Sequence, residues 1–468
     1  MKKGWDAIVI GAGPAGMSAA ARLAEDGACV LLLDQQESPG GQVYRALERN
    51  RSNAALMAVL GPDYEGGAPL IERLRGSSVV LGLGRSVWRI DRSGEVWTRQ
   101  SGRLERHRGR HVVIACGAIE RAVPLPGWTL PGVMTIGALQ IMLKESGLIP
   151  RDDVVLAGTG PLLYLYARQC LQAGASQVMI LDTASRADRL AALRRLPGAL
   201  TGQGWRYLAK GIGMLASIRK FGAEIHTGVH DIAIEGEEKA IGISFSTAAG
   251  RLRRACSLVA MHEGIIPHQQ MTRSLDCTHD WDEAERSFRP LRDTWGETSV
   301  RNVFVVGDAG GIIGARASAF DGEIAAVSIS TRLGRLSEAE RDSAYRRLAA
   351  NRIAHLSVRP LLQRLYKPRE DIVNPPDAVI ICRCENVSAG QIREAVLCGS
   401  LGPNQTKAFV RTGMGPCQGR LCGTSMTEII ARQRKVNPAE VGYYRIRSPL
   451  IPVPAAEIAS LTTEDETS

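Results

Sequence analysis

Short apolar runs and glycine-rich turns alternate through the first part of the chain. Residues Asp6–Ile10 form a β-rich run that leads directly into the turn Gly11–Gly16, with the sequence GAGPAG. The alanine-rich stretch Met17–Asp26 predicts a helix, and the apolar run Cys29–Leu33 predicts a second strand. This order of strand, tight turn, helix and strand is typical of the βαβ unit of nucleotide-binding domains.

The residue types in this first unit suit a dinucleotide. Gly11 permits the tight turn, Gly13 lets the backbone approach a pyrophosphate, and Gly16 lets the helix pack closely on the strand. The carboxylate that ends the second strand can accept a hydrogen bond from a ribose hydroxyl. The alternative is a glycine turn in an α/β fold that binds no ligand. From this segment we predict the cofactor-binding residues Gly11, Gly13, Pro14, Ala15, Gly16, Asp34 and Gln35.

A similar pattern returns further along the chain. Residues Asp153–Ala157 predict a strand, the turn Gly158–Leu163 follows, and a helix-like stretch leads to the strand Gln177–Leu181, which ends at Asp182. Leu163, however, stands where the third glycine of the pattern belongs, and a leucine there pushes the helix off the strand or fills the pocket. We therefore predict a degraded or repurposed NAD site, open to NAD, ATP or no ligand.

Two later segments point to the nature of the first cofactor. Segments His111–Arg121 and Arg301–Gly311 each predict a buried strand that ends in small residues. Together with Gly40–Tyr44, they resemble the flavoproteins with two dinucleotide-binding domains that are related to thioredoxin reductase. The resemblance implies FAD, with Asp308 on its ribityl chain and Gln42 beside the flavin, although Asp308 can also cap the following helix. The further FAD-binding residues that it implies are Gly41, Gln42, Ala115, Gly307 and Asp308.

One element of that family is missing. Its members carry a C-x-x-C redox pair in the second domain, whereas the corresponding segment here, Gly132–Ile141, contains no cysteine. We expect Gly132–Gly137 to form a linker and the packed start of a helix. Dithiol–disulfide chemistry is therefore not expected, and electrons must leave the flavin by another route.

Four cysteines near the C-terminus supply such a route. Cys382 and Cys384 form a C-x-C pair, and Cys417 and Cys422 form a C-x4-C pair. Two thiolate pairs suit an iron–sulfur cluster or a structural zinc ion, and a domain without metal is the remaining alternative. The segment Val379–Ala431 resembles the small [2Fe–2S] domain of bacterioferritin-associated ferredoxin, which implies that all four cysteines bind a [2Fe–2S] cluster.

Composition narrows the remaining classes of function. The chain of 468 residues is 44% hydrophobic and 23% charged, as in ordinary globular proteins. Its net charge is +10, but aromatic residues make up only 5%, so we predict no nucleic-acid partner. We find neither an apolar run of about 18 residues nor a signal peptide. We expect a cytoplasmic protein, one that can also lie peripherally at the inner face of the membrane.

Four side chains outside these patterns remain open. We expect Cys398 to be a packed thiol. His262 and His268 are either an ordinary loop pair or part of an interface to the isoalloxazine ring. Arg316 either contacts the flavin or a partner, or is a surface arginine.

The predicted fold class is α/β, with two Rossmann-like dinucleotide-binding domains of the thioredoxin-reductase-like type and a small C-terminal [2Fe–2S] domain. We predict no catalytic residue in it. The predicted divisions are an FAD-binding domain (1–130 and 300–345), a second nucleotide-binding domain (131–299), a linker (346–376), the [2Fe–2S] domain (377–445) and a tail (446–468).

The order of these parts resembles one family along almost the full chain. It is the large (alpha or A) subunit of heteromeric opine oxidases and amino-acid dehydrogenases, which includes the octopine and nopaline oxidase A subunits, the hydrogen cyanide synthase B subunit and the D-hydroxyproline dehydrogenase alpha subunit. The resemblance implies an electron-transfer subunit. A beta subunit that resembles D-amino-acid and sarcosine oxidases would oxidise the C–N bond of an opine, hydroxyproline or related amino acid.

The same resemblance extends to further components and leaves two alternatives. Some relatives add an FMN at a subunit interface and a small [2Fe–2S] gamma subunit, and electrons would pass to a respiratory or dye acceptor. The main alternative is a self-contained NAD(P)H-dependent flavoprotein reductase. The other is an assembly or sensor protein that uses the cysteines to bind metal.

Overall fold

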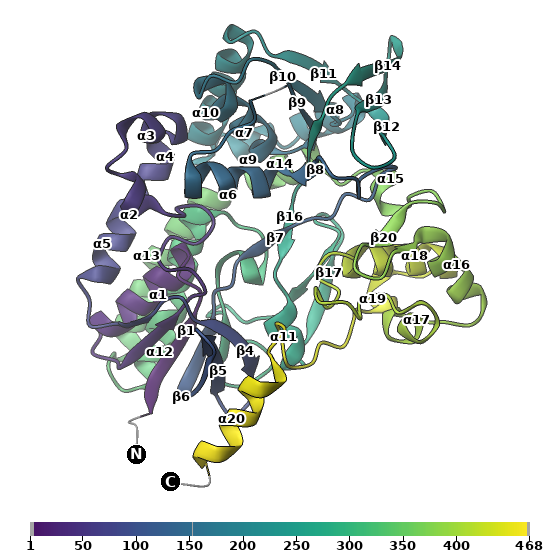
Figure 1. Cartoon of the computed structure of the whole chain (residues 1–468). Coiled ribbons are helices and arrows are strands. Elements are labelled where there is room, and N and C mark those ends of the chain that lie inside the picture. Colours follow the sequence, from purple (N-terminus) through teal and green to yellow (C-terminus); the bar gives the residue numbers. More distant parts are fainter. Residues whose placement is uncertain (1–3, 152, 466–468) are drawn as a thin grey trace.

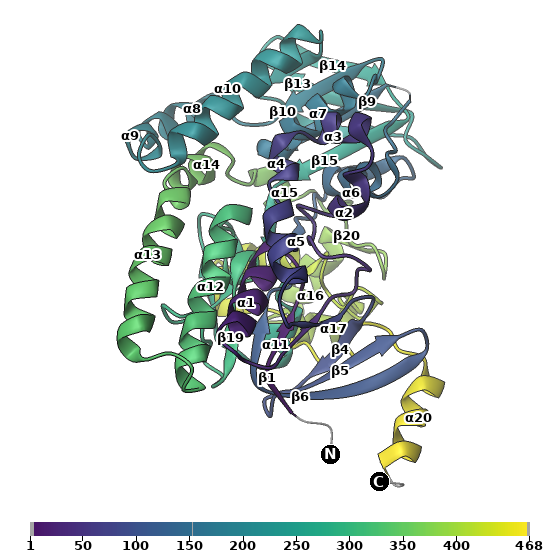
Figure 2. The same ribbon diagram turned by 90° about the vertical axis from the view of Figure 1, so that its left-hand side faces the viewer.

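The computed structural model describes residues 4–151 and 153–465, so the predicted tail 446–468 is described only to residue 465. Two α/β domains lie one above the other in Figure 1, and a small domain from the C-terminal part of the chain lies beside them. Figure 2, turned by 90°, shows the same separation of the two α/β domains. This arrangement agrees with the predicted α/β architecture.

The lower sheet in Figure 1 is built around the first glycine unit. Its central strand β1 pairs in parallel with β2 and β6, and Ala7, Ile8 and Val9 of β1 are fully buried, as expected of a strand covered on both faces. The C-terminal half of β6 also pairs with β19, while its N-terminal half continues into an antiparallel ribbon with β5 and β4. The strands are β1 (Trp5–Ile10), β2 (Val30–Leu33), β3 (Val80–Gly82), β4 (Ser86–Ile90), β5 (Glu95–Gln100), β6 (Arg103–Ile114) and β19 (Val303–Val305).

Helices α1 and α12 pack tightly against each other in this domain. The close approach needs glycine on α12, because a Cβ on Gly322 would lie 2.1 Å from the carbonyl oxygen of Ala15 on α1. Helix α13 packs on the other side of α12. The helices of this domain are α1 (Pro14–Glu25), α2 (Leu47–Asn50), α3 (Ala54–Leu60), α4 (Pro62–Glu65), α5 (Ala68–Arg75), α12 (Ala315–Arg332) and α13 (Glu338–Leu356), with a 3-10 turn η1 (Gly307–Gly310) before α12.

The upper sheet is wholly parallel, in the order β11-β10-β9-β15-β8. The segment Gly132–Gly137, predicted as a linker and the packed start of a helix, contributes the edge strand β8 in place of the linker. The predicted helix start is confirmed, because α6 begins at the buried Ile136 with Thr135 as N-cap. The elements here are β8 (Val133–Thr135), β9 (Val154–Thr159), β10 (Val178–Asp182), β11 (Glu224–Thr227), β15 (Leu258–Glu263), α6 (Ile136–Ser146), α7 (Pro161–Gln172), α8 (Arg186–Leu193), α9 (Leu196–Ala199) and α10 (Gly204–Lys220).

Short strands and helices connect the domains. The predicted linker 346–376 is largely helical, and its helix α14 packs on α8 of the upper domain. A three-stranded antiparallel sheet, two antiparallel two-stranded ribbons and three short helices complete this part: β12 (His230–Glu235), β13 (Gly242–Thr247), β14 (Gly250–Ala255), β7 (Ala118–Glu120) with β16 (Ile265–Pro267), β17 (His279–Asp282) with β18 (Ser287–Pro290), α11 (Gln270–Ser274), α14 (Arg359–Leu365) and α15 (Glu370–Val373).

The C-terminal domain packs four helices beside one small ribbon, and the chain then returns to the lower sheet. There the hydrophobic side chains of Ile451 and Val453 pack on Trp88 and Trp97 of the β4–β5 ribbon. None of the helices in the described residues is long and apolar enough to cross a membrane. The elements are β20 (Ile380–Cys382), β21 (Val387–Ser388), α16 (Ala389–Leu397), α17 (Pro403–Val410), α18 (Gly423–Arg434), α19 (Pro438–Val441) and α20 (Ala455–Asp465).

Candidate functional site

The first glycine turn brings the predicted residues of three segments together. A Cβ on Gly16 would lie 1.8 Å from the carbonyl oxygen of Gly11, so only glycine lets α1 start this close to the turn. Gly11 has φ of +109°, and a Cβ there would lie 2.4 Å from the carbonyl oxygen of Ala115 at the end of β6. The turn after β19 also lies against this site, because a Cβ on Gly307 would lie 2.8 Å from the Cβ of Ala15.

Asp34 directly follows β2 and reaches back to this turn. Its Oδ2 accepts from the backbone N–H of Ala12 at 2.6 Å, and its Oδ1 accepts from the N–H of Gln36 at 2.8 Å. Burial raises the pKa of Asp34 above its ordinary value, although these two N–H groups oppose the rise. The predicted residue Gln35, next to Asp34, is exposed to solvent. Gly41 packs on the turn as well, since a Cβ on it would lie 2.8 Å from the Cα of Gly13.

Asp308 organises the loop that leads into α12. Its Oδ1 accepts from the backbone N–H groups of Ile313 and Gly314, each at 2.8 Å. The carboxylate therefore secures the turn before the helix through one oxygen, and Oδ2 lies outside these two hydrogen bonds. Burial raises the pKa of Asp308. The alternative that Asp308 caps the following helix was wrong, because Gly314 is the N-cap of α12 and Asp308 bonds to the turn that precedes it.

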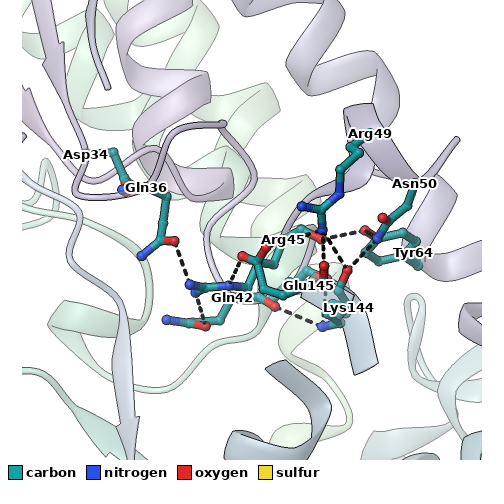
Figure 3. Close-up of polar contacts among 10 residues, drawn as sticks. Asp34, Gln36, Gln42, Arg45, Arg49, Asn50, Tyr64, Lys144 and Glu145 are labelled. Atoms are coloured by element: carbon teal, nitrogen blue, oxygen red, sulfur yellow. Dashed lines mark hydrogen bonds and ion pairs between the residues drawn. The ribbon is translucent and has the colours of Figure 1, made fainter. Parts of the chain in front are cut away.

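Helix α6 of the upper domain holds the segment that contains Gln42 (Figure 3). The Nζ of Lys144 donates to the carbonyl oxygens of Gln42 at 2.8 Å and Val43 at 3.0 Å, and Glu145 pairs with the Nε of Arg45 at 2.6 Å. Burial, together with repulsion by Arg45, lowers the pKa of Lys144 to about 7. The backbone of Gln42 is therefore fixed by contacts from the other domain.

Two buried charges at this site escaped the sequence analysis, Lys144 and Asp321. Asp321, on α12, accepts from the N–H of Gly307 at 2.8 Å and pairs with Arg292 at 2.5 Å and Arg352 at 2.6 Å. Each of the two charges interrupts an apolar or alanine-rich helical stretch. A buried charge needs partners, so this interruption is the signal that could have revealed them.

The second glycine turn lies against the neighbouring strand β15, much as the first lies against Ala115. Gly158 and Gly160 have φ of +132° and +114°, and His262 of β15 lies against both. A Cβ on Gly158 would lie 1.8 Å from the His262 carbonyl oxygen, and a Cβ on Gly160 would lie 3.2 Å from the His262 ring. The Nδ1 of His262 contacts the Oε1 of Glu120 at 2.5 Å. His262 therefore lies in a strand, and its interpretation as a loop residue was wrong.

Asp182, the counterpart of Asp34, is enclosed by side chains. Its Oδ2 accepts from the hydroxyl of Tyr164 and from Nη2 of Arg189, both at 2.5 Å, and its Oδ1 accepts from the N–H of Ala184 at 2.9 Å. Asp182 is only 2% exposed. A ribose could reach this carboxylate only by displacing the tyrosine or the arginine.

The predicted linker closes the same unit from outside. Arg369, between α14 and α15, donates through Nε to Oε1 of Glu263 at 2.7 Å, and the Glu263 side chain is fully buried at the end of β15. Tyr366 is partly buried within electrostatic reach of Asp182, and desolvation, together with the charge of Asp182, raises the pKa of Tyr366 to about 12. The edge of the upper sheet that would receive a nucleotide is thus covered by this chain's own residues.

The four C-terminal cysteines lie as two contacting pairs. Cys382 shares a hydrogen bond with Cys422 in the interior, and Cys384 contacts Cys417 toward the surface. Within the described residues, no three His, Cys, Asp or Glu side chains converge as ligands of a single metal ion. Two separate pairs instead suit a cluster with two iron atoms, each held by two cysteines.

Backbone amides and glycines shape the space around these pairs. The Cys422 thiol, followed by the N–H groups of Gly413, Glu385 and Cys384, stabilises a thiolate at Cys382 and lowers the pKa of Cys382 to about 6. These donors supply the hydrogen bonds to sulfur that iron–sulfur sites use. The residues present therefore fit a cysteine-ligated cluster.

The cysteine domain is docked by polar contacts on the part of the chain that connects the two α/β domains. The Nε1 of Trp128 donates to the carbonyl oxygen of Ile380 at 2.6 Å. Arg286 pairs with Glu428 through two hydrogen bonds of 2.7 and 2.5 Å, and Glu428 is 2% exposed. The cysteine pairs are thus held in a defined position beside the flavin-type domain.

Two single-residue expectations have different outcomes. Cys398 follows α16 and is exposed, so its interpretation as a packed thiol was wrong, because the residue lies beyond the buried face of that helix. Arg316 is exposed at the start of α12, and it lies against Gly66, where a Cβ would approach its Nη2 to 2.5 Å. It thus packs on a loop of its own domain, as a surface arginine does.

Comparisons with known proteins agree with this geometry. A family model described as "Pyridine nucleotide-disulphide oxidoreductase" matches residues 5–322, and one described as "BFD-like [2Fe-2S] binding domain" matches residues 380–432. The A subunit of opine oxidase from Rhizobium meliloti (strain 1021) is 44% identical over 457 residues, which cover 98% of this chain and 99% of the relative. The HcnB subunit of hydrogen cyanide synthase from Pseudomonas aeruginosa is 30% identical, and the match covers 98% of this chain and 99% of the relative.

Among solved structures, L-proline dehydrogenase from P. horikoshii matches with a TM-score of 0.69, covering 97% of this chain and 79% of its own. At 16% identity this likeness shows the fold alone. The predicted fold class and the predicted cofactors FAD and [2Fe–2S] are confirmed by these matches. The chain belongs to the pyridine nucleotide-disulphide oxidoreductase family, as an FAD-dependent oxidoreductase with a C-terminal [2Fe–2S] binding domain, and its full-length relatives include opine oxidase A subunits.

Proposed function

We propose that this chain is the electron-transfer subunit of a heteromeric dehydrogenase or oxidase that oxidises the C–N bond of an opine, hydroxyproline or a related amino acid. FAD would lie on the first glycine turn with the predicted residues around it, and Cys382, Cys384, Cys417 and Cys422 would hold the [2Fe–2S] cluster. Bound there, the two groups supply electron storage and transfer, while the chain binds and positions them.

The observation that carries this proposal is the closed second nucleotide unit. A reductase that takes hydride from NADH needs a strand-end carboxylate that the ribose can reach, and one that uses NADH or NADPH needs an accessible glycine turn. Here Asp182 is bonded to Tyr164 and Arg189, and Arg369 of the linker segment pairs with Glu263 beside it. The electrons are therefore expected to come from another subunit rather than from a nicotinamide.

The names of the relatives support the rest of the proposal. The A subunit of opine oxidase and the HcnB subunit of hydrogen cyanide synthase are each named as one component of a larger enzyme. We propose that the partner that binds the substrate is a beta subunit resembling D-amino-acid and sarcosine oxidases, and that the acceptor is a respiratory-chain component. The interfacial FMN, a bound ATP or NAD in the second unit and the gamma subunit stay predictions.

The test is an anaerobic absorbance experiment on the chain co-expressed with the genes beside its own. Adding opines and amino acids should bleach the flavin and iron–sulfur bands only when the partner subunit is present. The chain alone should not bleach with NADH or NADPH. Rapid bleaching of the isolated chain by either nucleotide would overturn the proposal and make the chain a self-contained reductase.

A pair of cysteine variants tests the cluster assignment in the same complex. Cys422→Ser removes one buried member of the inner pair and should abolish bound iron and the reduction of a dye acceptor. Cys398→Ser is the matched control, because Cys398 is exposed in the same domain and outside both pairs. Equal iron content in the two variants would contradict the assignment.

A further inference from the structure

The strand that ends at the flavin site is tied to the segment that follows β16. Beyond Ala115, the thiol of Cys116 donates to the carbonyl oxygen of His268 at 3.4 Å. In return, the backbone N–H of His268 donates to the carbonyl oxygen of Gly117 at 3.0 Å. These two hydrogen bonds fix His268 directly behind the end of β6.

Arg420 connects His268 to the cysteine domain. Its Nε lies 3.3 Å from Nε2 of His268, its Nη1 donates to the carbonyl oxygen of Cys417 at 3.3 Å, and its Nη2 donates to the carbonyl oxygen of Leu450 at 2.6 Å. Since the guanidinium can only donate, His268 accepts at Nε2 and carries its proton on Nδ1. In the described structure this buried Nδ1 has no hydrogen-bond partner.

A second contact holds the same loop. The side-chain amide of Gln270, two residues after His268, donates to the carbonyl oxygen of Gln418 at 3.2 Å. The backbone N–H of Arg420 itself donates to the carbonyl oxygen of Cys417 at 3.1 Å. The loop that carries Cys417 is therefore docked at two points on the segment behind the flavin strand.

The position of Arg420 also gives it an electrostatic role. Both Cys417 and Cys116 lie within electrostatic reach of its guanidinium. An arginine remains protonated in proteins, so its positive charge is permanent. The reduction potential of an iron–sulfur cluster depends on nearby charge and on hydrogen bonds around the sulfur ligands, and a fixed positive charge favours the reduced form.

We propose that Arg420 is a positioning residue that holds Cys417 against the His268 segment and, through its charge, raises the reduction potential of the cluster bound by the four cysteines. This inference rests on the proposed function only in its purpose, which is to favour electron flow from the flavin side toward the cluster. The contacts themselves join the two sites through Cys116, His268, Arg420 and Cys417.

The test is a redox titration of the full-length, cluster-loaded chain with dithionite and mediator dyes, followed by absorbance and by the paramagnetic signal of the reduced cluster. At a fixed potential near the wild-type midpoint, Arg420→Gln should raise the ratio of oxidised to reduced cluster by about tenfold, since one charge is lost beside it. Arg420→Lys keeps the charge and should stay close to wild type.

Two further variants keep the result interpretable. His268→Phe retains the charge of Arg420 but removes its acceptor, and it should shift the ratio in the same direction by about threefold. Arg434→Gln is the matched control, because Arg434 ends α18 about 16 Å along the helix from Gly423, and it should not shift the ratio. Wild-type ratios in both Arg420→Gln and His268→Phe would overturn the proposal.

The titration separates this inference from the proposed function. The reductant is chemical, so neither a partner subunit nor an amino-acid substrate is needed. A failure of substrate bleaching would refute the proposed function without changing the effect of Arg420 on the cluster, and the reverse also holds.

Discussion

The two βαβ units of this chain have the same backbone plan and opposite accessibility. In both, the aspartate that ends the second strand accepts at Oδ1 from the N–H two residues ahead, at Gln36 in one and Ala184 in the other. The second oxygen differs. That of Asp34 accepts from the backbone N–H of Ala12 in its glycine turn, whereas that of Asp182 is held by two side chains. An acidic residue at the right place thus marks a nucleotide site only if its neighbours leave it accessible.

The two units also differ in how the helix packs at the third position of the glycine motif. At Gly16 the helix packs on bare backbone, and there is no room for a Cβ. At Leu163 the helix packs through a fully buried leucine side chain. The departure at the third position therefore occurs in the unit whose strand-end carboxylates are bonded by Tyr164, Arg189 and Arg369.

The largest effect is expected from substitutions at the third position of each glycine motif. Gly16→Leu should abolish FAD binding, because any Cβ there collides with the carbonyl oxygen of Gly11 at 1.8 Å. Leu163→Ala should keep FAD and lose about 2–5 kcal/mol of stability through the cavity it leaves. The ratio of flavin to protein after purification and the free energy of unfolding distinguish the two. Retained flavin in Gly16→Leu would contradict the role of the close approach.

A second change tests how the linker closes the upper unit. Arg369→Met leaves the fully buried Glu263 without its arginine and should cost about 3–5 kcal/mol of stability. Adding Glu263→Met should recover most of this loss, since a buried ion pair can be replaced by apolar side chains. Chemical denaturation of the two variants and the wild type measures both steps. If the double variant recovers no stability, the Arg369–Glu263 pair contributes more than the mutual neutralisation of two charges, and the prediction is wrong.

A third change compares the two aspartates directly. Asp34→Asn should weaken FAD binding by about tenfold or more, since a carboxylate at a ribose or at the turn loses its charge-assisted hydrogen bonds. Asp182→Asn should leave FAD affinity unchanged and cost about 1–3 kcal/mol of stability, because Arg189 and Tyr164 lose their partner. Fluorimetric FAD titration of the apoprotein gives the affinities, and equal affinities would refute the distinction.

The smallest expected effect concerns acid stability of the lower sheet. Burial, with repulsion from Arg332 and Arg110, lowers the pKa of His111 on β6 to about 4. An unfolded histidine titrates near 6.5, so between these values the unfolded state binds more protons and stability falls as pH decreases. At pH 5.5 the loss attributable to His111 should be about 1 kcal/mol. The free energy of unfolding, measured between pH 7 and pH 5, should decrease less steeply for His111→Gln than for the wild type. An unchanged slope would show that His111 does not cause the loss of stability.

Much of the fold could be predicted because it depends on local patterns. The first unit follows from its apolar runs and glycines, and the cysteine domain follows from two closely spaced pairs. The edge strand β8 was missed because three residues carry too little periodicity, and the helical nature of the linker 346–376 was missed because arginines and prolines obscure a weakly amphipathic pattern. Lys144 and Asp321 could not be assigned a role before their partners from distant segments were visible.

The sequence by itself determined the two glycine turns, the C-terminal cysteine pairs and the lack of a cysteine pair in the segment Gly132–Ile141, because each of these depends on residue types at short spacing. Only the tertiary structure decided how Asp182 and Glu263 are enclosed, since Tyr164 of α7, Arg189 of α8 and Arg369 of the linker reach these carboxylates from separate parts of the chain. It also decided that His268 and Arg420 join the two redox domains, because the two residues lie 152 positions apart. Contacts of that range depend on how packed domains meet, and no local pattern encodes them.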